Sequence, residues 1–263
     1  MARSSPDTSR PNTNPANTNQ ADTNPPNTSR RNARGQERAR ARHIALVRFT
    51  LLGLAFALIS QFGLTSATAA IPRVRPVGLG TAWSHSLVGH QQVIVVSAAN
   101  RTATRVTVTA WDRVGNRWYQ VGNWSGHAGA KGWYKAKQRD QRSPVGMFTL
   151  SSAGGYLKNP GTVLPYQYNR SRYSTVKNHV RTFDYVLAID FNHKVGTPPL
   201  SNVYPQGYAK GGHIWVHVDH NSPTNGCITM PESGLLTVLR WLDPAKKPVI
   251  VMGPANYLAG AGA

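Results

Sequence analysis

The stretch that most constrains the fold runs from Gly211 to Pro231 and reads GGHIWVHVDHNSPTNGCITMP. Its first half alternates like a β-strand with two different faces, placing His213, Trp215 and His217 on one face and Ile214, Val216 and Val218 on the other. Its second half is rich in residues that favour turns. The stretch therefore predicts a strand, a tight loop and then Cys227 directly after Gly226.

Cys227 is the only cysteine in the chain, so it cannot form an internal disulfide and is either incidental or reactive. A cysteine nucleophile needs a partner that helps remove the thiol proton. His217 is the expected base, because the turn can fold it towards Cys227. Gly226 allows close backbone approach, so the Cys227 amide and a neighbour would form an oxyanion hole. A buried structural cysteine is the alternative interpretation.

The three histidines of this stretch also raise the question of a metal site. His213 and His217 would share a strand face but lie four residues, roughly 13 Å, apart. His220 is expected in the turn. We therefore predict neither a metal site nor a cofactor.

The N-terminal part of the chain does not have the composition of a folded domain. A five-residue repeat between Asp7 and Arg31 has no strongly apolar position, so residues 1–43 are expected to be a disordered, basic, low-complexity tail. Residues 44–70 combine a basic start, a short apolar run and an Ala-Thr-Ala site ending at Ala69, as in a signal peptide. An uncleaved membrane anchor is the alternative, although the 11-residue run is shorter than the roughly 20 needed to span.

The remaining sequence predicts one mainly β domain. Residues 71–90 are interpreted as a linker, 91–253 as the domain and 254–263 as a C-terminal tail. Strands are expected at 93–96, 105–111, 117–121, 142–150, 185–189 and 248–252, a Gly-rich connection at 122–132 and one helix at 232–242. The long irregular segment 151–182 is either a binding lid or a surface loop that uses tyrosines for packing. Many strands and one helix indicate a sandwich or barrel.

Two motifs now carry a resemblance to a known family. Ile214-Trp-Val-His217 followed by Pro223-Thr-Asn-Gly-Cys227-Ile-Thr-Met-Pro231 resembles the signature of the L,D-transpeptidase (YkuD-like) catalytic domain, most closely its exported actinobacterial branch. Residues 137–150, with Asp140, Ser143-Pro144 and Gly146-Met-Phe148, are similar to the family pattern Gly-Asp-Gly-x-(Ser/Thr)-Pro-x-Gly-x-Phe. Segments 185–192 and 235–251 also fit, so the resemblance covers roughly residues 91–252.

The resemblance implies a mixed-sheet β-sandwich with one helix after the catalytic loop. Cys227 would attack the carbonyl between stem position three and the D-Ala at position four of peptidoglycan, and the acyl group would pass to a neighbouring stem as a 3-3 crosslink. His217 would move the proton, oriented by the Val218 carbonyl. The implied partners are donor and acceptor stem peptides, in the cell wall or extracytoplasmic space.

The sequence also departs from the family pattern. Asn225 stands where many members have His, and Thr229 where many have Arg or Asn. Arg139 and Gln141 replace glycines. With Gly226 and Thr224 kept, we expect an intact nucleophilic core and an altered substrate preference.

Other functions remain open. An L,D-carboxypeptidase that transfers the acyl group to water, and a non-catalytic wall-binding module of the same fold, are the alternatives. Papain-like endopeptidases place Cys before His, and sortases need a later Arg that Arg240, in the predicted helix, does not supply. The net charge of +20 favours anionic partners such as nucleic acid, a membrane surface or a cell-wall polymer, and does not say which. Together with the family resemblance it makes anionic cell-wall polymers the expected partner. No nucleic-acid-binding motif accompanies the charge, and membrane contact is expected only through an uncleaved N-terminal segment.

Overall fold

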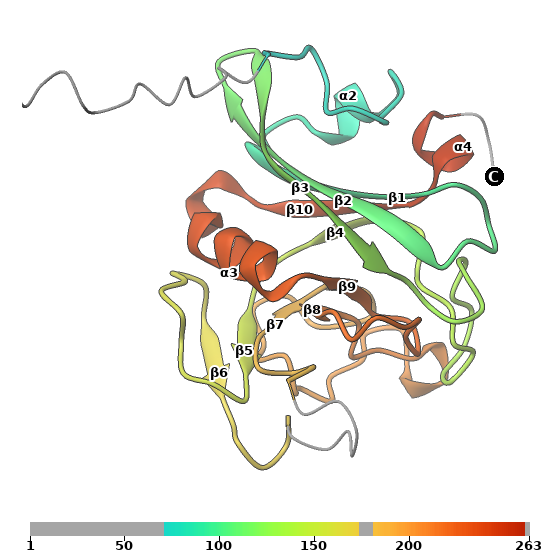
Figure 1. The fold of residues 1–263 in the computed structure, drawn as a ribbon, viewed down its shortest axis with the longest axis vertical. Coiled ribbons are helices and arrows are strands. Elements are labelled where there is room, and N and C mark those ends of the chain that lie inside the picture. The colour runs from blue at the N-terminus through green and yellow to red at the C-terminus, as the bar shows by residue number, and fades with distance from the viewer. Residues whose placement is uncertain (1–70, 174–180, 261–263) are drawn as a thin grey trace, which may run out of the picture. The chain divides into compact units, whose positions relative to one another are not determined.

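The computed structural model describes residues 71–173 and 181–260, which form two five-stranded sheets (Figure 1). The strands are β1 (Gln92–Ala98), β2 (Arg105–Val114), β3 (Arg117–His127), β4 (Gly146–Thr149), β5 (Ala153–Gly155), β6 (Tyr166–Tyr168), β7 (Val186–Ala188), β8 (Trp215–Val218), β9 (Ile228–Met230) and β10 (Val249–Pro254). The helices are α2 (Trp83–Ser86), α3 (Glu232–Trp241) and α4 (Ala255–Leu258), with 3-10 turns at Tyr208–Lys210 and Pro244–Lys246.

The predicted N-terminal tail (1–43) and the predicted signal peptide or anchor (44–70) lie outside the described residues. Within 71–173 and 181–260, no helix is both long enough and apolar enough to cross a bilayer.

The first sheet has the order β3-β2-β1-β10-β4. Its central strands β1 and β10 run parallel, and the other pairs are antiparallel. The uninterrupted apolar run of β1 has a physical reason, because Ile94 and Val96 face one apolar cluster while Val93 and Val95 face another. A strand covered on both faces needs no polar alternation.

The second sheet has the order β6-β5-β7-β8-β9 and carries the stretch from which the sequence argument began. The pairs β5–β6 and β8–β9 are parallel, while β7 runs antiparallel to β5 and β8. Both sheets are therefore mixed, and α3 follows β9. The predicted fold class, a mainly β mixed-sheet sandwich with one helix after the Cys227 loop, is confirmed.

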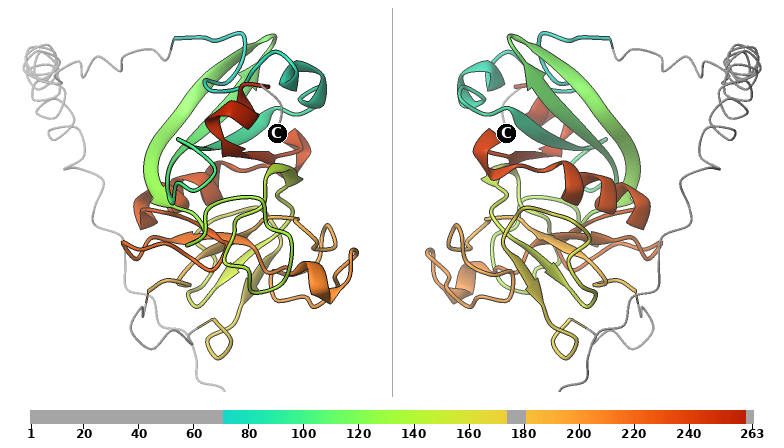
Figure 2. Two further views of the ribbon diagram at one scale, coloured as in Figure 1. Left: turned by 90° about the vertical axis from the view of Figure 1, so that its right-hand side faces the viewer. Right: turned by 90° about the vertical axis from the view of Figure 1, so that its left-hand side faces the viewer.

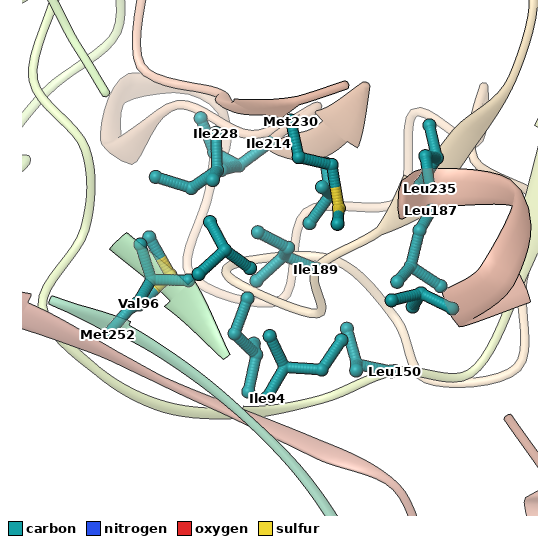
Figure 3. Packing of buried hydrophobic residues seen from close by; sticks show 14 of the residues in the cluster. Ile94, Val96, Leu150, Leu187, Ile189, Ile214, Ile228, Met230, Leu235 and Met252 are labelled. Atoms are coloured by element: carbon teal, nitrogen blue, oxygen red, sulfur yellow. The ribbon is translucent and has the colours of Figure 1, made fainter. Parts of the chain in front are cut away.

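The main core lies between the two sheets (Figure 3). Ile94 and Met252 of the first sheet meet Ile228 and Met230 of the second, and all four are fully buried. The apolar stripe of α3, which includes Leu235, closes one side of this core. Full burial of each such side chain stabilises the fold by about 1.5–3 kcal/mol, so the core fixes the position of β8 and β9 against the first sheet.

Two of the expected boundaries need correction. Residues 71–90 are not a free linker, because Leu79 and Leu87 pack on the outer face of the first sheet. The described part of the predicted tail, residues 254–260, is not free either, since α4 buries Leu258 in the same cluster. In Figures 1 and 2 these segments lie on the side of the first sheet that faces away from the second. The apolar outer face of β1 and β10 requires such a cover.

The expected Gly-rich connection at 122–132 is also wrong in part, because β3 continues to His127 alongside β2, with a bulge between Ala110 and Trp111. Gly126 has a packing role, since a Cβ there would collide with the Thr229 carbonyl of β9. Glycine therefore lets β3 lie directly on β9. Segment 151–182 contains the short strands β5 and β6 and the buried Tyr173, while its part at 174–180 lies outside the described residues.

Candidate active site

The site is built on the parallel pair β8–β9. The register pairs Val216 with Ile228 and His217 with Thr229, and one step back it places Cys227 beside Trp215, whose amide lies 3.4 Å from the Cys227 Sγ. Cys227 and His217 are thus diagonal neighbours on one face of the sheet, about 7–8 Å apart between Cα atoms. Both line one cavity of about 250 Å³.

His217 is buried, and its ring is oriented by the backbone of its own strand. Its Nδ1 lies 3.0 Å from the Val218 carbonyl, so Nδ1 carries the proton and Nε2 keeps a free lone pair. Phe183 packs edge-on against the ring at 5.1 Å, and His220 stacks on it at 5.7 Å. The Val218 carbonyl therefore has the orienting position that the sequence predicts.

The pKa of His217 is lowered to about 4, first because burial disfavours the imidazolium and then because of the neighbouring His220. The Val218 hydrogen bond and the charge of Asp219 act in the opposite direction. At neutral pH the ring is therefore uncharged and can accept a proton at Nε2.

The Cys227 thiol rests against the backbone of the chain leading into β8. Its Sγ lies 3.6 Å from the His213 carbonyl, to which the S–H donates. Burial raises the pKa of the thiol to about 11, while the Trp215 amide and the Lys135 ammonium oppose this effect. Among the described residues, the sulfur contacts the Trp215 amide and the His213 carbonyl and has no hydrogen bond to His217. Catalytic hydrogen bonds are often long or absent before substrate binds.

The loop before Cys227 is held rigid by its own hydrogen bonds. The Thr224 hydroxyl donates to the Cys227 carbonyl at 2.7 Å and accepts from the Gly226 amide at 2.9 Å. Ser143 donates to the Gly226 carbonyl at 2.9 Å from the neighbouring segment. Gly226 has φ 133°, and a Cβ there would lie 2.7 Å from the Arg142 carbonyl. The Gly226 amide is therefore engaged within the loop.

Asn225 and Thr229, the two departures from the family pattern, lie in different surroundings. Asn225 is exposed, lines the cavity and accepts a long 3.4 Å contact from the Gln141 side chain. Thr229 is fully buried: its hydroxyl donates to Asp219 and accepts from the His127 amide. Thr229 therefore supports the fold beneath the site and is not among the residues that line the cavity.

Asp219 completes this buried network. It accepts from the Thr229 hydroxyl at 2.5 Å and lies 2.8 Å from the His127 Nδ1. Burial alone would raise the pKa of Asp219, but these two hydrogen bonds and the charge of His127 hold it below its ordinary value. The sequence argument did not include His127, and only the contact of β3 with β9 could reveal it.

The segment similar to the second family motif supports the loop from the other side. Arg139 and Gln141, which replace glycines, have φ 61° and 58°, so the glycine-like backbone persists without glycine. Asp140 accepts from the amides of Ala136 and Arg142 at 2.7 and 3.1 Å. It also forms a buried ion pair with Lys135 at 2.9 Å. No sequence signal distinguished Lys135, which pairs with Asp140 and also lowers the pKa of the Cys227 thiol.

The other two histidines of the stretch have different environments. His213 lies before β8 with φ 52°, so it does not continue the strand, and its Nε2 is 3.0 Å from the Ser201 carbonyl. His220 lines the cavity, and its Nδ1 is 2.7 Å from the Ser222 hydroxyl. Within the described part of the chain, no three His, Cys, Asp or Glu side chains gather in a way that could hold a metal ion.

Comparison with known proteins bears on this geometry. The family described as the L,D-transpeptidase catalytic domain (YkuD) matches residues 91–251. No curated protein sequence matched the chain. Among solved structures, the helical cell shape determining protein Pgp2 from Campylobacter jejuni is 13% identical, with a TM-score of 0.35 and coverage of 65% of this chain and 52% of that one. Bd1075 of Bdellovibrio bacteriovorus is 12% identical, with a TM-score of 0.37 and coverage of 70% and 52%.

The chain thus spans about half the length of these two structures. The family match covers more than half of this chain and includes both motifs, strands β8 and β9, and the Cys227 loop. The protein therefore belongs to the L,D-transpeptidase catalytic domain family.

Proposed function

We propose that the protein is a cysteine-dependent acyltransferase that forms 3-3 crosslinks between peptidoglycan stem peptides. The observation that carries the proposal is the shared cavity of Cys227 and His217, with His217 held by Val218 so that Nε2 keeps its lone pair. Membership of the family supports the substrate class.

In the first half-reaction the sulfur attacks the carbonyl between stem position three and D-Ala. His217 takes the thiol proton at Nε2, so that a thiolate never has to persist in the buried site. The oxyanion develops next to the Cys227 amide. Collapse of the tetrahedral intermediate breaks the C–N bond, and His217 returns the proton to the leaving D-Ala amine, leaving a thioester on Cys227.

In the second half-reaction the side-chain amine of an acceptor stem attacks the thioester. Neutral His217 accepts a proton from that amine, and the sulfur leaves with the proton restored. Water in place of the amine would give L,D-carboxypeptidase activity, the alternative that the same site allows. His220 and Asn225 also line the cavity, so these side chains would contact a bound substrate.

A turnover experiment tests this proposal. Purified protein is incubated with a disaccharide tetrapeptide, and the products are followed by liquid chromatography and mass spectrometry. We expect release of D-Ala together with a 3-3 crosslinked dimer, both abolished in Cys227→Ala. D-Ala release without dimer would favour the carboxypeptidase, and crosslinking by Cys227→Ala would exclude the proposed nucleophile. A wall-binding module would sediment with purified peptidoglycan without releasing D-Ala.

The location of the protein belongs to the same proposal. A substrate in the cell wall requires export, for which residues 44–70 have a suitable pattern. The net charge of +20 would favour residence among anionic wall polymers. Mass spectrometry of the mature N-terminus, together with fractionation of cells into cytoplasm, membrane and wall, tests both statements.

A further inference from the structure

One buried polar group beside the catalytic pair has no structural explanation. Thr182 is 4% exposed, and its hydroxyl oxygen has no hydrogen-bond partner among the described residues. A buried hydroxyl without a partner costs about 1–3 kcal/mol of stability, so such groups are rare and call for a reason. Thr182 is one of the residues that line the cavity of Cys227 and His217.

The backbone fixes Thr182 in this place. Its carbonyl accepts from the Val218 amide at 3.2 Å, at the end of β8. The next residue, Phe183, packs its ring edge-on against His217 and also against Trp215. Thr182 is thus anchored to Val218, whose carbonyl orients the base.

Resting on the function proposed above, we infer that Thr182 binds the donor: its hydroxyl forms a hydrogen bond to a backbone amide of the stem peptide that acylates Cys227. A hydroxyl can donate to a carbonyl and accept from an N–H, so it suits a peptide backbone. The donor must fill the cavity around the sulfur before any acceptor reacts, so a group on this wall meets the donor first. The bound peptide would supply the partner that the Thr182 hydroxyl lacks among the described residues.

Conservative substitutions separate this role from a structural one. Thr182→Val removes the hydroxyl and keeps the shape, whereas Thr182→Ser keeps the hydroxyl. Ser152→Ala is the matched control, because the Ser152 hydroxyl is also buried without a partner among the described residues but lies outside the cavity lining. The measured quantities are kcat and KM for the donor tetrapeptide, KM for the acceptor, the alkylation rate of Cys227 by iodoacetamide, and Tm.

For Thr182→Val we expect the donor KM to rise about three- to tenfold, the worth of one hydrogen bond, with kcat, acceptor KM and alkylation unchanged. Its Tm should stay level or rise, because an unsatisfied buried group has been removed. Thr182→Ser should restore the donor KM to within about twofold, and Ser152→Ala should not change it.

Several results would overturn the inference. An unchanged donor KM in Thr182→Val, or a change in the acceptor KM alone, would remove Thr182 from donor binding. A lowered Tm with equal losses in all activities would assign it a structural role. If wild-type protein is alkylated at Cys227 but does not release D-Ala, the proposed function is refuted, and this inference is refuted with it. If wild-type protein is active and Thr182→Val has an unchanged donor KM, only the inference is refuted.

Discussion

The buried Lys135–Asp140 ion pair allows a quantitative prediction. The side chains are 2% and 8% exposed and meet at 2.9 Å. Burial alone would raise the pKa of Asp140, but the Ala136 and Lys137 amides, the Lys135 ammonium and the Arg142 amide lower it from 3.8 to about 2. By linkage, this shift corresponds to about 2 kcal/mol of stability at neutral pH.

Asp140→Asn removes that contribution and also leaves the Lys135 ammonium buried without its counter-charge. We expect a total loss of about 3–5 kcal/mol at pH 7, which lowers Tm by roughly 10 °C for a domain of this size. The double variant Asp140→Asn/Lys135→Met should recover most of the loss, because a well-packed apolar side chain needs no partner.

The contribution of Asp140 to stability should depend on pH. Because the folded-state pKa of Asp140 is depressed, its stabilisation is complete above about pH 4, the unfolded value, and is lost as the pH falls through about 2. Urea denaturation of wild type and Asp140→Asn should therefore give a large difference at pH 7 that shrinks towards pH 2.

The matched control is the exposed pair of Lys246 with Asp112, at 3.0 Å and with side chains 33% and 22% exposed. Asp112→Asn should cost less than about 1 kcal/mol. The reasoning is refuted if Asp140→Asn lies within about 0.5 kcal/mol of wild type at pH 7, well below the cost of breaking a buried pair. A difference that does not shrink in acid would also refute it.

Three further predictions concern the site and its support. Burial raises the pKa of the Cys227 thiol to about 11, so the rate of its alkylation by iodoacetamide should still increase between pH 9 and pH 10. The rate is measured by intact mass, and a plateau by pH 8 would contradict this prediction. Gln141→Gly should raise Tm by a few degrees, since it relieves about 1 kcal/mol of left-handed backbone strain at φ 58°; a fall in Tm would show that the contact with Asn225 matters more. Thr229→Val should destabilise the domain by about 1–3 kcal/mol in urea, because the His127 amide loses its acceptor. The surface change Thr237→Val serves as its control, and equal effects of the two would contradict a role for the buried network.

The neutral resting state of the site has a mechanistic consequence. With the pKa of Cys227 at about 11 and that of His217 at about 4, burial opposes charge on both groups, so no preformed thiolate–imidazolium pair is expected. In the reaction proposed above, proton transfer would therefore accompany attack on the bound carbonyl, which would favour a substrate that fills the cavity. Lys135 and the Trp215 amide then stabilise negative charge developing on the sulfur.

Much of the fold could be predicted from local patterns. The alternation before Cys227 predicted β8 with Val216 and His217 on opposite faces, and the spacing of Leu235, Val238 and Leu239 predicted α3. Periods of two and 3.6 residues distinguish a strand from a helix and group the residues that share a face. The apolar run 93–96 correctly predicted strand β1, which is buried on both faces. The prediction of a linker over residues 71–90 was wrong, because periodicity does not say which distant segment covers the outer face of that strand.

For the site, the sequence by itself determined the chemistry, with one cysteine, an upstream histidine and a Gly-Cys loop whose geometry only glycine permits. Only the tertiary structure decided the surroundings. Thr229, a departure from the family pattern, is buried where β3 packs against β9, and Lys135 and Thr182 come from segments that carry no motif. The sequence states side-chain type and local spacing directly. The hydrogen-bond partners, the burial and hence the pKa of each group depend on contacts between segments that are far apart in sequence.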